Sequence, residues 1–185
     1  MINSYLKEPA LTSYLLPITL LLSEVEVLPI TYYLLPIPPM IRIQTVNYSE
    51  HLTEIKAIRY QVFELEQGIN PELEFDGEDE LAQHLLAYLD DYPIGTLRIR
   101  YLDPEKAKIE RLAVLASARG MGIGQQLMEC ALEAIAQTSI TIVIVNAQTY
   151  IKNLYLKLGF EAIGEPFQEA EIAHIKMIKY LGNRE

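Results

Sequence analysis

The stretch Arg119-Gly120-Met121-Gly122-Ile123-Gly124 lies between a strand-like segment, residues 108–115, and a helix-like segment, residues 125–137. Three glycines within five residues let the backbone of such a turn come close to a ligand. The first amides of a helix have no partner inside the helix, and the helix dipole makes that end attractive to anions. The sequence therefore predicts an anion-binding turn between a strand and a helix.

The spacing of these glycines argues against two common nucleotide-binding turns. A dinucleotide-binding turn reads G-x-G-x-x-G, but Gln125 stands where the third glycine should be, and the next strand ends at Asn146 rather than at an acidic residue. A P-loop closes with Gly-Lys-Ser/Thr, whereas this turn closes with Gly124-Gln125-Gln126. Dinucleotides and nucleoside triphosphates are therefore poor candidates for the anion.

A second motif adds to the glycine turn. The turn itself matches the pattern Q/R-x-x-G-x-G/A through Arg119, Gly122 and Gly124, and residues 153–160 read Asn-Leu-Tyr-Leu-Lys-Leu-Gly-Phe. The first resembles the pyrophosphate-binding turn of the GNAT superfamily, the acyl-CoA-dependent N-acetyltransferases. The second resembles that superfamily's helix with a tyrosine, which ends in a glycine before the next strand.

Further segments fit one small bacterial branch of that superfamily. They are Arg-Tyr-Gln-Val-Phe at 59–63, Glu-Gln-Gly-Ile at 66–69, Glu-Leu-Glu-Phe-Asp at 72–76 and His-Ile-Lys-Met at 174–177. They resemble the opening segments and the last strand of the ElaA-like branch, and the likeness covers about residues 40–180. The resemblance implies an α/β fold with a mixed, mostly antiparallel central sheet, one parallel splayed pair of strands and flanking helices.

Length and composition limit the classes of protein and of site. Half of the 185 residues are apolar, which suits a single folded domain with a sizeable core. Cys130 is the only cysteine, and three scattered histidines lack metal-ligand spacing, so we expect neither a disulfide framework nor a metal site. A net charge of −10 argues against nucleic acid and membrane partners, which need clustered Lys and Arg. We expect a protein of the reducing cytoplasm, and the sequence leaves a homodimer open.

Residues 1–39 differ in composition from the rest of the chain. They contain six prolines, only four charged residues and leucine-rich runs. The apolar run 10–23 is too short for a bilayer, which needs about 20 residues, and Pro17 interrupts it. We interpret residues 1–39 as an apolar, Pro-rich leader, with Met40 as a candidate natural start, and residues 40–185 as the N-acetyltransferase domain.

The first elements follow directly after Met40. Residues 41–46 resemble the first strand of the superfamily, and apolar residues at three- and four-residue steps predict a helix that Ser49 caps and that ends near Glu66. Residues 67–80 are polar and acidic, which indicates a loop with a short helical turn. The three segments that follow are predicted antiparallel strands, namely residues 84–89, 94–101 and 108–115.

The segments after the glycine turn predict a cleft. Residues 125–137 have one polar and one apolar face, which predicts an amphipathic helix. Residues 140–145 are almost all β-branched, which predicts a strand buried on both faces. A helix between two strands implies a right-handed crossover and parallel pairing. Ligands of α/β sheets commonly bind at the carboxyl ends of such strands.

Transfer of an acetyl group from a thioester to an amine makes two chemical demands. An alkylammonium with a pKa of about 10 must lose a proton, and the departing thiolate benefits from a nearby acid. The resemblance implies that Tyr155 is the acid, although apolar neighbours on its helix face leave an ordinary core aromatic as the alternative. Glu110 is the predicted base, or else only an ion-pair partner of Arg98 or Arg100.

The same resemblance implies where acetyl-CoA binds. The glycine-turn amides would hold the pyrophosphate, Arg119 would add a cation, and the strand before the turn would pair with the pantetheine arm through its backbone. Asn146 would bond the cofactor's amides or cap the next helix. The predicted cofactor-binding residues are Leu112, Ala113, Val114, Arg119, Gly120, Met121, Gly122, Ile123, Gly124 and Asn146.

Acidic and histidine side chains are candidates for contact with the acceptor. Glu74 and Asp76 suit a cationic acceptor, and a solvated charge run is the alternative reading. His84 is also a candidate for contact with the acceptor, and both His84 and His174 could serve as the base by the intrinsic pKa of a histidine. Each is a single histidine in an alternating strand, so a satisfied structural group is the alternative. Cys130 lies on the packed face of its helix, so we expect no nucleophilic role.

The predicted function is acetyl-CoA-dependent transfer of an acetyl group directly to a primary amine of a small molecule or peptide. A non-catalytic acyl-CoA sensor would keep the glycine turn but would need neither Tyr155 nor a base. A plain interaction protein would leave the glycine turn without a purpose.

Overall fold

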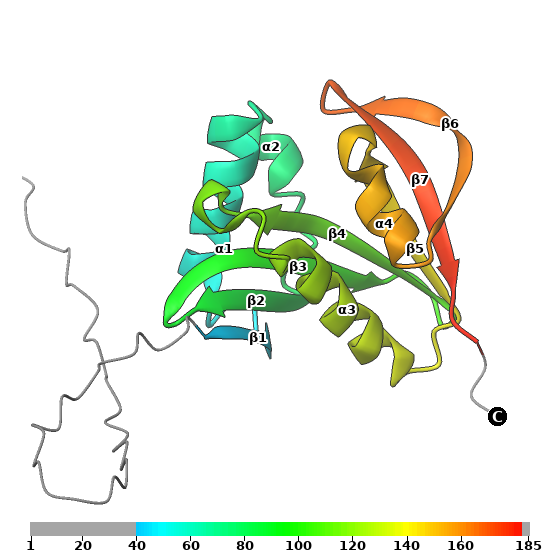
Figure 1. Ribbon diagram of the computed structural model, residues 1–185, viewed down its shortest axis with the longest axis horizontal. Coiled ribbons are helices and arrows are strands. Elements are labelled where there is room, and N and C mark those ends of the chain that lie inside the picture. The colour runs from blue at the N-terminus through cyan, green and yellow to red at the C-terminus, as the bar shows by residue number, and fades with distance from the viewer. Residues whose placement is uncertain (1–39, 183–185) are drawn as a thin grey trace, which may run out of the picture. The chain divides into compact units, whose positions relative to one another are not determined.

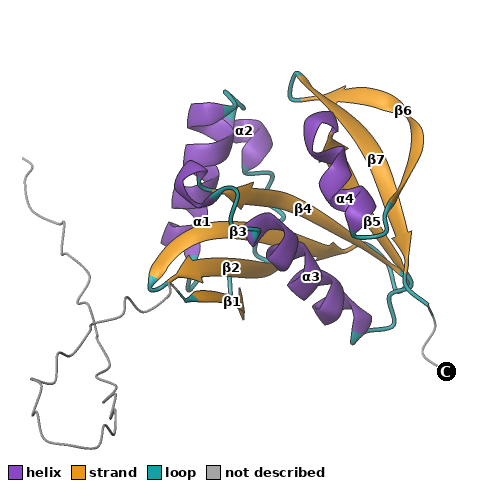
Figure 2. Cartoon of the chain, in the orientation of Figure 1, coloured by secondary structure: helices purple, strands orange, loops and turns teal. Residues whose placement is uncertain are grey.

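A seven-stranded mixed sheet runs through residues 40–182, the residues that the computed structural model describes (Figure 1, Figure 2). The strands are β1 (Ile41–Val46), β2 (Gln83–Leu89), β3 (Tyr92–Tyr101), β4 (Lys106–Val114), β5 (Ile142–Gln148), β6 (Glu161–Glu169) and β7 (Ile172–Tyr180). The helices are α1 (Leu52–Arg59), α2 (Pro71–Glu74), α3 (Ile123–Ala136) and α4 (Lys152–Lys157), with a π-helical segment η1 (Tyr60–Glu66) and short 3-10 turns η2 (Ala116–Ala118) and η3 (Thr149–Ile151). Our predictions for residues 1–39 lie outside the described residues.

The strands follow the order β1-β2-β3-β4-β5-β7-β6 across the sheet. All neighbouring pairs are antiparallel except β4 and β5, which are parallel and are connected through α3. A helical crossover returns the chain in its original direction, which accounts for this one parallel pair. The predicted mixed, mostly antiparallel sheet is therefore confirmed.

The parallel pair separates soon after it forms. Register between β4 and β5 extends only from Lys106 opposite Ile142 to Lys108 opposite Ile144. Beyond these positions β4 continues to Val114 and β5 to Gln148, without pairing to one another. The two strands therefore splay at their carboxyl ends, and the β5-facing edge of β4 is left open there.

Helices cover both faces of the sheet. Leu85 on β2 packs in one apolar cluster with Leu127 of α3, whereas its neighbour Leu86 packs in another with Ile55 of α1. Adjacent residues of a strand point to opposite faces, so α3 and α1 lie on opposite sides of the sheet (Figure 1). Within residues 40–182, no helix combines the length and the apolar character that crossing a membrane requires.

The first helix differs from its prediction at one end. It starts at Leu52 after the N-cap residue His51, and no side chain caps it, so the assignment of Ser49 as the cap was wrong. Glu54 in its first turn and a contact between Glu54 and the His51 ring stabilise that end instead. The helix continues through η1 and ends at Glu66, close to the predicted boundary.

Strand β5 is less buried than its composition suggested. Val143, Val145 and Ala147 are buried in the apolar cluster that contains α3, but Ile142 and Ile144 are only half buried and belong to neither apolar cluster. The prediction of a strand buried on both faces was therefore wrong for one face. A run of β-branched residues indicates a strand, but it does not say how many layers cover it.

A buried network of charges joins the acidic loop to the sheet. Arg98 on β3 is fully buried and donates hydrogen bonds to Asp76 at 2.6 Å, to Asp79 at 2.8 Å and to Glu110 at 2.5 Å. Arg59 at the end of α1 is also fully buried and donates to Asp79 at 2.7 Å and to both the carboxylate and the carbonyl of Glu74. Because a buried charge is costly without a partner, these arginines fix residues 74–79 against β3 and β4.

We predict that Arg98→Met lowers the free energy of unfolding by about 3–5 kcal/mol, because it leaves buried carboxylates without a counter-charge. The matched variant is Lys106→Met on the neighbouring strand β4, whose partner Asp103 is 40% exposed. Exposed pairs contribute at most about 1 kcal/mol, so this control should unfold at nearly the wild-type urea concentration. Similar urea midpoints for the two variants would contradict the structural role of Arg98.

Candidate active site

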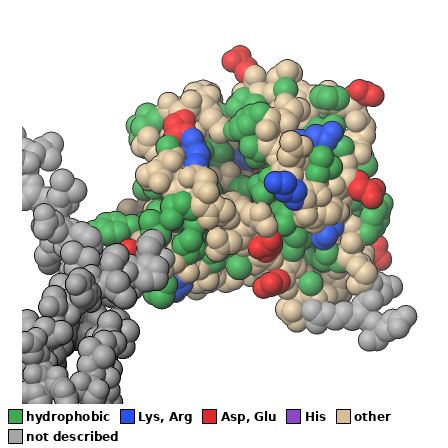
Figure 3. Space-filling model, in the orientation of Figure 1, with side chains coloured by type: hydrophobic (Ala, Val, Ile, Leu, Met, Phe, Trp, Pro, Cys, Tyr) green, Lys and Arg blue, Asp and Glu red, His purple; other side chains and the backbone are tan. Residues whose placement is uncertain are grey.

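Two cavities meet where β4 and β5 splay. One has a volume of about 630 Å³ and is bordered by the glycine turn, and the other has a volume of about 210 Å³ and is bordered by the ends of β4, β5 and β7. Leu112, Gln148 and Ile151 line both cavities, so the two spaces adjoin. Figure 3 shows this face hollowed between the α1–α2 side and the α4–β7 side.

The glycine turn has the backbone that the sequence predicted. Gly120 and Gly122 have φ angles of +82° and +78°, a conformation that side chains disfavour, and Gly122 is the N-cap of α3. Within the described residues, the backbone amides of residues 120–125 donate no hydrogen bond. A row of free amides at the start of a 14-residue helix is suited to holding an anion.

Gly124 differs from Gly120 and Gly122, because its backbone conformation does not require a glycine. Its φ angle is not left-handed, and a Cβ atom added there would lie 3.8 Å from Val114 and 3.9 Å from Leu154, which is ordinary contact. The protein alone would therefore tolerate a side chain at this position. Since Gly124 lines the larger cavity, the missing side chain leaves room for a ligand rather than for protein packing.

Arg119 is fixed at the edge of the same cavity. Its Nε donates to the Val114 carbonyl at 3.0 Å, and its Nη2 pairs with Glu66 at 2.5 Å. A second contact crosses the splay, since Gln148 on β5 donates to the Gln67 side chain at 3.0 Å. The side chain of Met121 and that of Ala113 do not line either cavity, so only their backbone could contact a ligand there.

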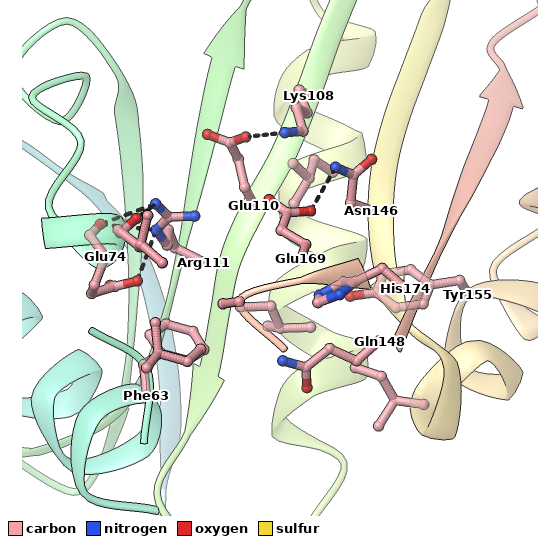
Figure 4. A pocket seen from close by; sticks show the side chains of 16 residues that line it. Phe63, Glu74, Lys108, Glu110, Arg111, Asn146, Gln148, Tyr155, Glu169 and His174 are labelled. Carbon is pink, nitrogen blue, oxygen red and sulfur yellow. Dashed lines mark hydrogen bonds and ion pairs between the residues drawn. The ribbon is translucent and has the colours of Figure 1, made fainter. Parts of the chain in front are cut away.

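The smaller cavity contains the titratable groups of the site. Figure 4 shows Glu110 on one side of this cavity and Tyr155 and His174 on the other, with Asn146 and Glu169 between them. Tyr155 is 5% exposed and its ring meets Phe160 edge-on at 5.9 Å.

The Tyr155 hydroxyl is available to a ligand. Among residues 40–182 it has no hydrogen-bond partner, although the residue lines the cavity. Burial raises the pKa of Tyr155 above the ordinary value of a tyrosine, so the hydroxyl keeps its proton at neutral pH. The side chain therefore combines core packing of its ring with a free proton donor at its tip.

Glu110 forms the ion pairs with Arg98 and Arg100 that we gave as the alternative to its role as base. It contacts Arg98 at 2.5 Å, Lys108 at 2.7 Å and Arg100 at 3.5 Å. Burial works to raise the pKa of Glu110, but the hydrogen bond and charge of Lys108 and the charge of Arg98 outweigh it, so the pKa is lowered. A carboxylate with a lowered pKa is a poor proton acceptor.

The predicted acceptor-binding residues lie elsewhere or are already paired. Asp76 and His84 line neither cavity, and His84 is 1% exposed with its Nε2 against the Asp79 carbonyl, so neither meets an acceptor in this structure. Glu74 lines the smaller cavity, but it is 2% exposed and paired with Arg59 and Arg111. The alternative of a solvated charge run was wrong for Glu74, because that residue is buried against arginines.

Asn146 does not cap a helix. It lies inside β5, which extends to Gln148, and its amide donates to the Glu169 carboxylate at 2.9 Å. It lines the smaller cavity and not the larger one, so a contact with a cofactor would involve the acyl end. Sequence reasoning missed Glu169 and Gln148 as cavity residues, because only the pairing of β5, β6 and β7 brings them there. No group of three or more candidate metal-ligating side chains occurs in the part of the chain that the structure describes.

Comparison with known proteins identifies the family to which this chain belongs. Residues 50–181 match the family described as acetyltransferase (GNAT) domain. The chain is 34% identical to an uncharacterized N-acetyltransferase, YjcF, of Bacillus subtilis, over 71% of this chain and 94% of that protein. It is 32% identical to protein ElaA of Escherichia coli, over 76% and 97% of the two chains.

Solved structures agree with this assignment. The crystal structure of Escherichia coli ElaA matches with a TM-score of 0.68 at 30% identity, covering 76% of this chain and 99% of that chain. An acyl-CoA N-acyltransferase from Pseudomonas aeruginosa matches with a TM-score of 0.67 at 31% identity, again covering 76% and 99%. The chain therefore belongs to the GNAT family of acetyltransferases, in the ElaA-like branch, and is an acyltransferase.

Proposed function

We propose that this protein transfers an acetyl group from acetyl-CoA directly to a primary amine of a small molecule or peptide. The observation that supports this most is the junction of two cavities, one beside free helix amides and one beside a free tyrosine hydroxyl. A thioester that extends from the first cavity into the second would present its carbonyl carbon to an amine held in the smaller space.

Acetyl-CoA fits the larger cavity in two ways. Its pyrophosphate would accept hydrogen bonds from the free amides of residues 120–125, and the positive end of the α3 dipole would add to the attraction. Its pantetheine amides would pair with the open edge of β4 at Leu112, Ala113 and Val114, as an added strand does. The similar protein from Pseudomonas aeruginosa is named an acyl-CoA N-acyltransferase, which favours the same class of cosubstrate.

The chemistry then needs a proton acceptor for the amine and a proton donor for the thiolate. Tyr155 serves as the donor, because its hydroxyl is unpaired, faces the smaller cavity and stays protonated at neutral pH. The amine nitrogen attacks the thioester carbonyl, the C–S bond breaks, and the thiolate takes the Tyr155 proton. No covalent enzyme intermediate is required, and the lowered pKa of Glu110 favours an electrostatic role for that carboxylate.

A non-catalytic acyl-CoA sensor would share the cofactor site. Wild-type protein should release free CoA thiol from acetyl-CoA in the presence of at least one member of a panel of primary amines, and release without amine should be slow. Binding of acetyl-CoA with no amine-dependent thiol release across the panel would support the sensor instead.

We predict that Gly124→Glu abolishes acetyl-CoA binding without unfolding the protein. A carboxylate in the first turn of α3 suits the helix dipole, but from this position it would enter the larger cavity and repel the pyrophosphate. At a ligand concentration of about 100 times Kd, binding stabilises the wild type by about 2.7 kcal/mol, and the variant should gain nothing. Thermal melting with and without acetyl-CoA measures this.

The control for that experiment is Gln126→Glu. It adds the same charge to the same helical turn, but Gln126 does not line the larger cavity. If acetyl-CoA stabilises Gly124→Glu and Gln126→Glu equally, the pyrophosphate does not bind at this turn.

We predict that Tyr155→Phe keeps the fold and the affinity for acetyl-CoA, because the ring and its contact with Phe160 remain and the hydroxyl has no protein partner to lose. Turnover should fall by about 10²–10⁴-fold, the usual effect of removing a positioned acid, with little change in the Michaelis constant for acetyl-CoA. Steady-state kinetics with an active amine provide the measurement. Turnover within a few-fold of wild type would make Tyr155 a core residue only.

A further inference from the structure

The charges around the smaller cavity are balanced with one exception. Ion pairs connect five basic side chains, Arg59, Arg98, Arg100, Lys108 and Arg111, with five carboxylates, Glu74, Asp76, Glu78, Asp79 and Glu110. Glu169 also lines the cavity, and it has no basic partner among the described residues. Its carboxylate accepts only the neutral amide of Asn146, at 2.9 Å.

The position of Glu169 is set by an unusual turn. Glu169 ends β6, Ile172 begins β7, and the two residues between them, Ala170 and Glu171, have φ angles of +48° and +61°. Two-residue hairpins need left-handed residues at both positions, and glycine or asparagine is the usual choice. This hairpin adopts the tight turn without either, and the turn holds Glu169 and Ala170 at the wall of the cavity.

His174 is fixed as a proton acceptor on the same wall. It is 8% exposed, and its ring stacks on Phe167 with centroids 5.9 Å apart. Its Nδ1 lies 2.8 Å from the Ile172 carbonyl, and because a carbonyl only accepts, Nδ1 donates. In the neutral ring the other nitrogen, Nε2, then has a free lone pair, and no described residue bonds to it. Nε2 is absent from the buried unpartnered atoms of the described residues, so this lone pair is accessible, and it belongs to a residue that lines the same cavity as Tyr155.

We propose that the smaller cavity binds small cationic amines without a carboxylate group, with Glu169 as the ammonium-binding residue and His174 as the general base. The proposal rests on the function proposed above. Glu169 attracts the ammonium, and His174 Nε2 takes one of its protons, which gives a free amine and an imidazolium. The amine attacks the thioester, the thiolate leaves with the Tyr155 proton, and the second proton on nitrogen restores Tyr155. The imidazolium returns its proton to solvent, so one proton is released for each acetyl group transferred.

The same balance of charge predicts that acceptors with a carboxylate group bind poorly. The basic residues that line the cavity, Lys108 and Arg111, are each engaged by a carboxylate at 2.7 Å and 2.9 Å. An acceptor carboxylate would therefore meet Glu169 without a free cation to offset the repulsion. The smaller cavity has about a third of the volume of the larger one, about 210 Å³ against about 630 Å³, which favours a small acceptor group.

The pH dependence of the rate also depends on the other titratable groups of the smaller cavity. Those that share it with His174 are Tyr155 from α4, Glu169 from β6, Lys108, Glu110 and Arg111 from β4, and Glu74 from α2. Tyr155 has a raised pKa and Glu110 a lowered one, so neither changes charge near neutral pH. The paired β5 neighbour of His174 is Gln148, which is uncharged.

The first test compares acceptors by CoA thiol release from acetyl-CoA. Isobutylamine, valinamide and valine share one side chain, and histamine, histidinamide and histidine share another. The amines and the amides should be acetylated at least about tenfold faster than the matching amino acids, because only the acids have a carboxylate. Equal rates for the acids and the amides would overturn the proposal, whereas no turnover with any amine would overturn the proposed function itself.

The second test is His174→Gln, with the best amine of that panel. At pH 7 the variant should lose about 10²–10⁴-fold in kcat/KM, while stabilisation by acetyl-CoA stays at the wild-type level. Its remaining rate should rise about tenfold for each pH unit, because only the free amine can react and its fraction grows in that way below the amine's own pKa. The role of His174 would be overturned if kcat/KM of the wild type rose with pH as steeply as that of the variant. It would also be overturned if Glu110→Gln lost activity to the same extent and His174→Gln lost none.

The third test is Glu169→Gln, matched by Glu165→Gln, an exposed β6 residue that lines neither cavity. Loss of the carboxylate should raise the Michaelis constant for the amine by about tenfold to a hundredfold, and Glu165→Gln should leave it unchanged. Equal Michaelis constants for the two variants would overturn the assignment of Glu169.

Discussion

Pairing between the parallel strands β4 and β5 stops after Lys108 and Ile144, and the site depends on that early stop. Past it, β4 keeps a backbone edge without a neighbour, and the chain between the two strands enters α3 through the glycine turn with its first amides free. Both cavities open in this gap and share their border residues. A fully paired sheet would close the edge, since backbone groups pair wherever strands run together.

The splay between β4 and β5 removes backbone hydrogen bonds from the sheet. Next to it, buried ion pairs fix the acidic loop to the strands. Arg98 and Arg59 fasten the acidic loop to β3 and β4, while Arg111, at a bulge with φ +55° in β4, reaches Glu74 at 2.9 Å and the carbonyl of Leu73. A bulge turns a side chain away from the regular alternation, which lets β4 present Arg111 to the loop and Leu112 to the cavities. Among the three carboxylates that line the smaller cavity, Glu74 and Glu110 are paired with cations and Glu169 is not.

Much of this architecture could be predicted from the sequence. Strand β1 has the bounds that the family resemblance implied, and the glycine turn has positive φ at Gly120 and Gly122, which only glycine adopts easily. These features are local, because periodicity and backbone freedom act over a few residues. The wrong prediction for the second face of β5 concerns what packs against an element, whereas the wrong Ser49 cap concerns the residue at which a helix starts.

The sequence by itself determined the order of elements, the glycine turn and the family likeness, because these reside in short motifs. The tertiary structure alone decided which charges face a ligand. Glu74 and Asp76 belong to a polar stretch, and only the docking of that stretch onto two buried arginines pairs them with cations, while His84 is buried in β2 against the Asp79 carbonyl. Glu169 and His174 lie on either side of one tight turn, and Asn146, which is more than 20 residues away in sequence, meets them through the pairing of β5, β6 and β7. Long-range strand pairing leaves no signal at the residues it brings together, since each one's local pattern is the same wherever the strand lies.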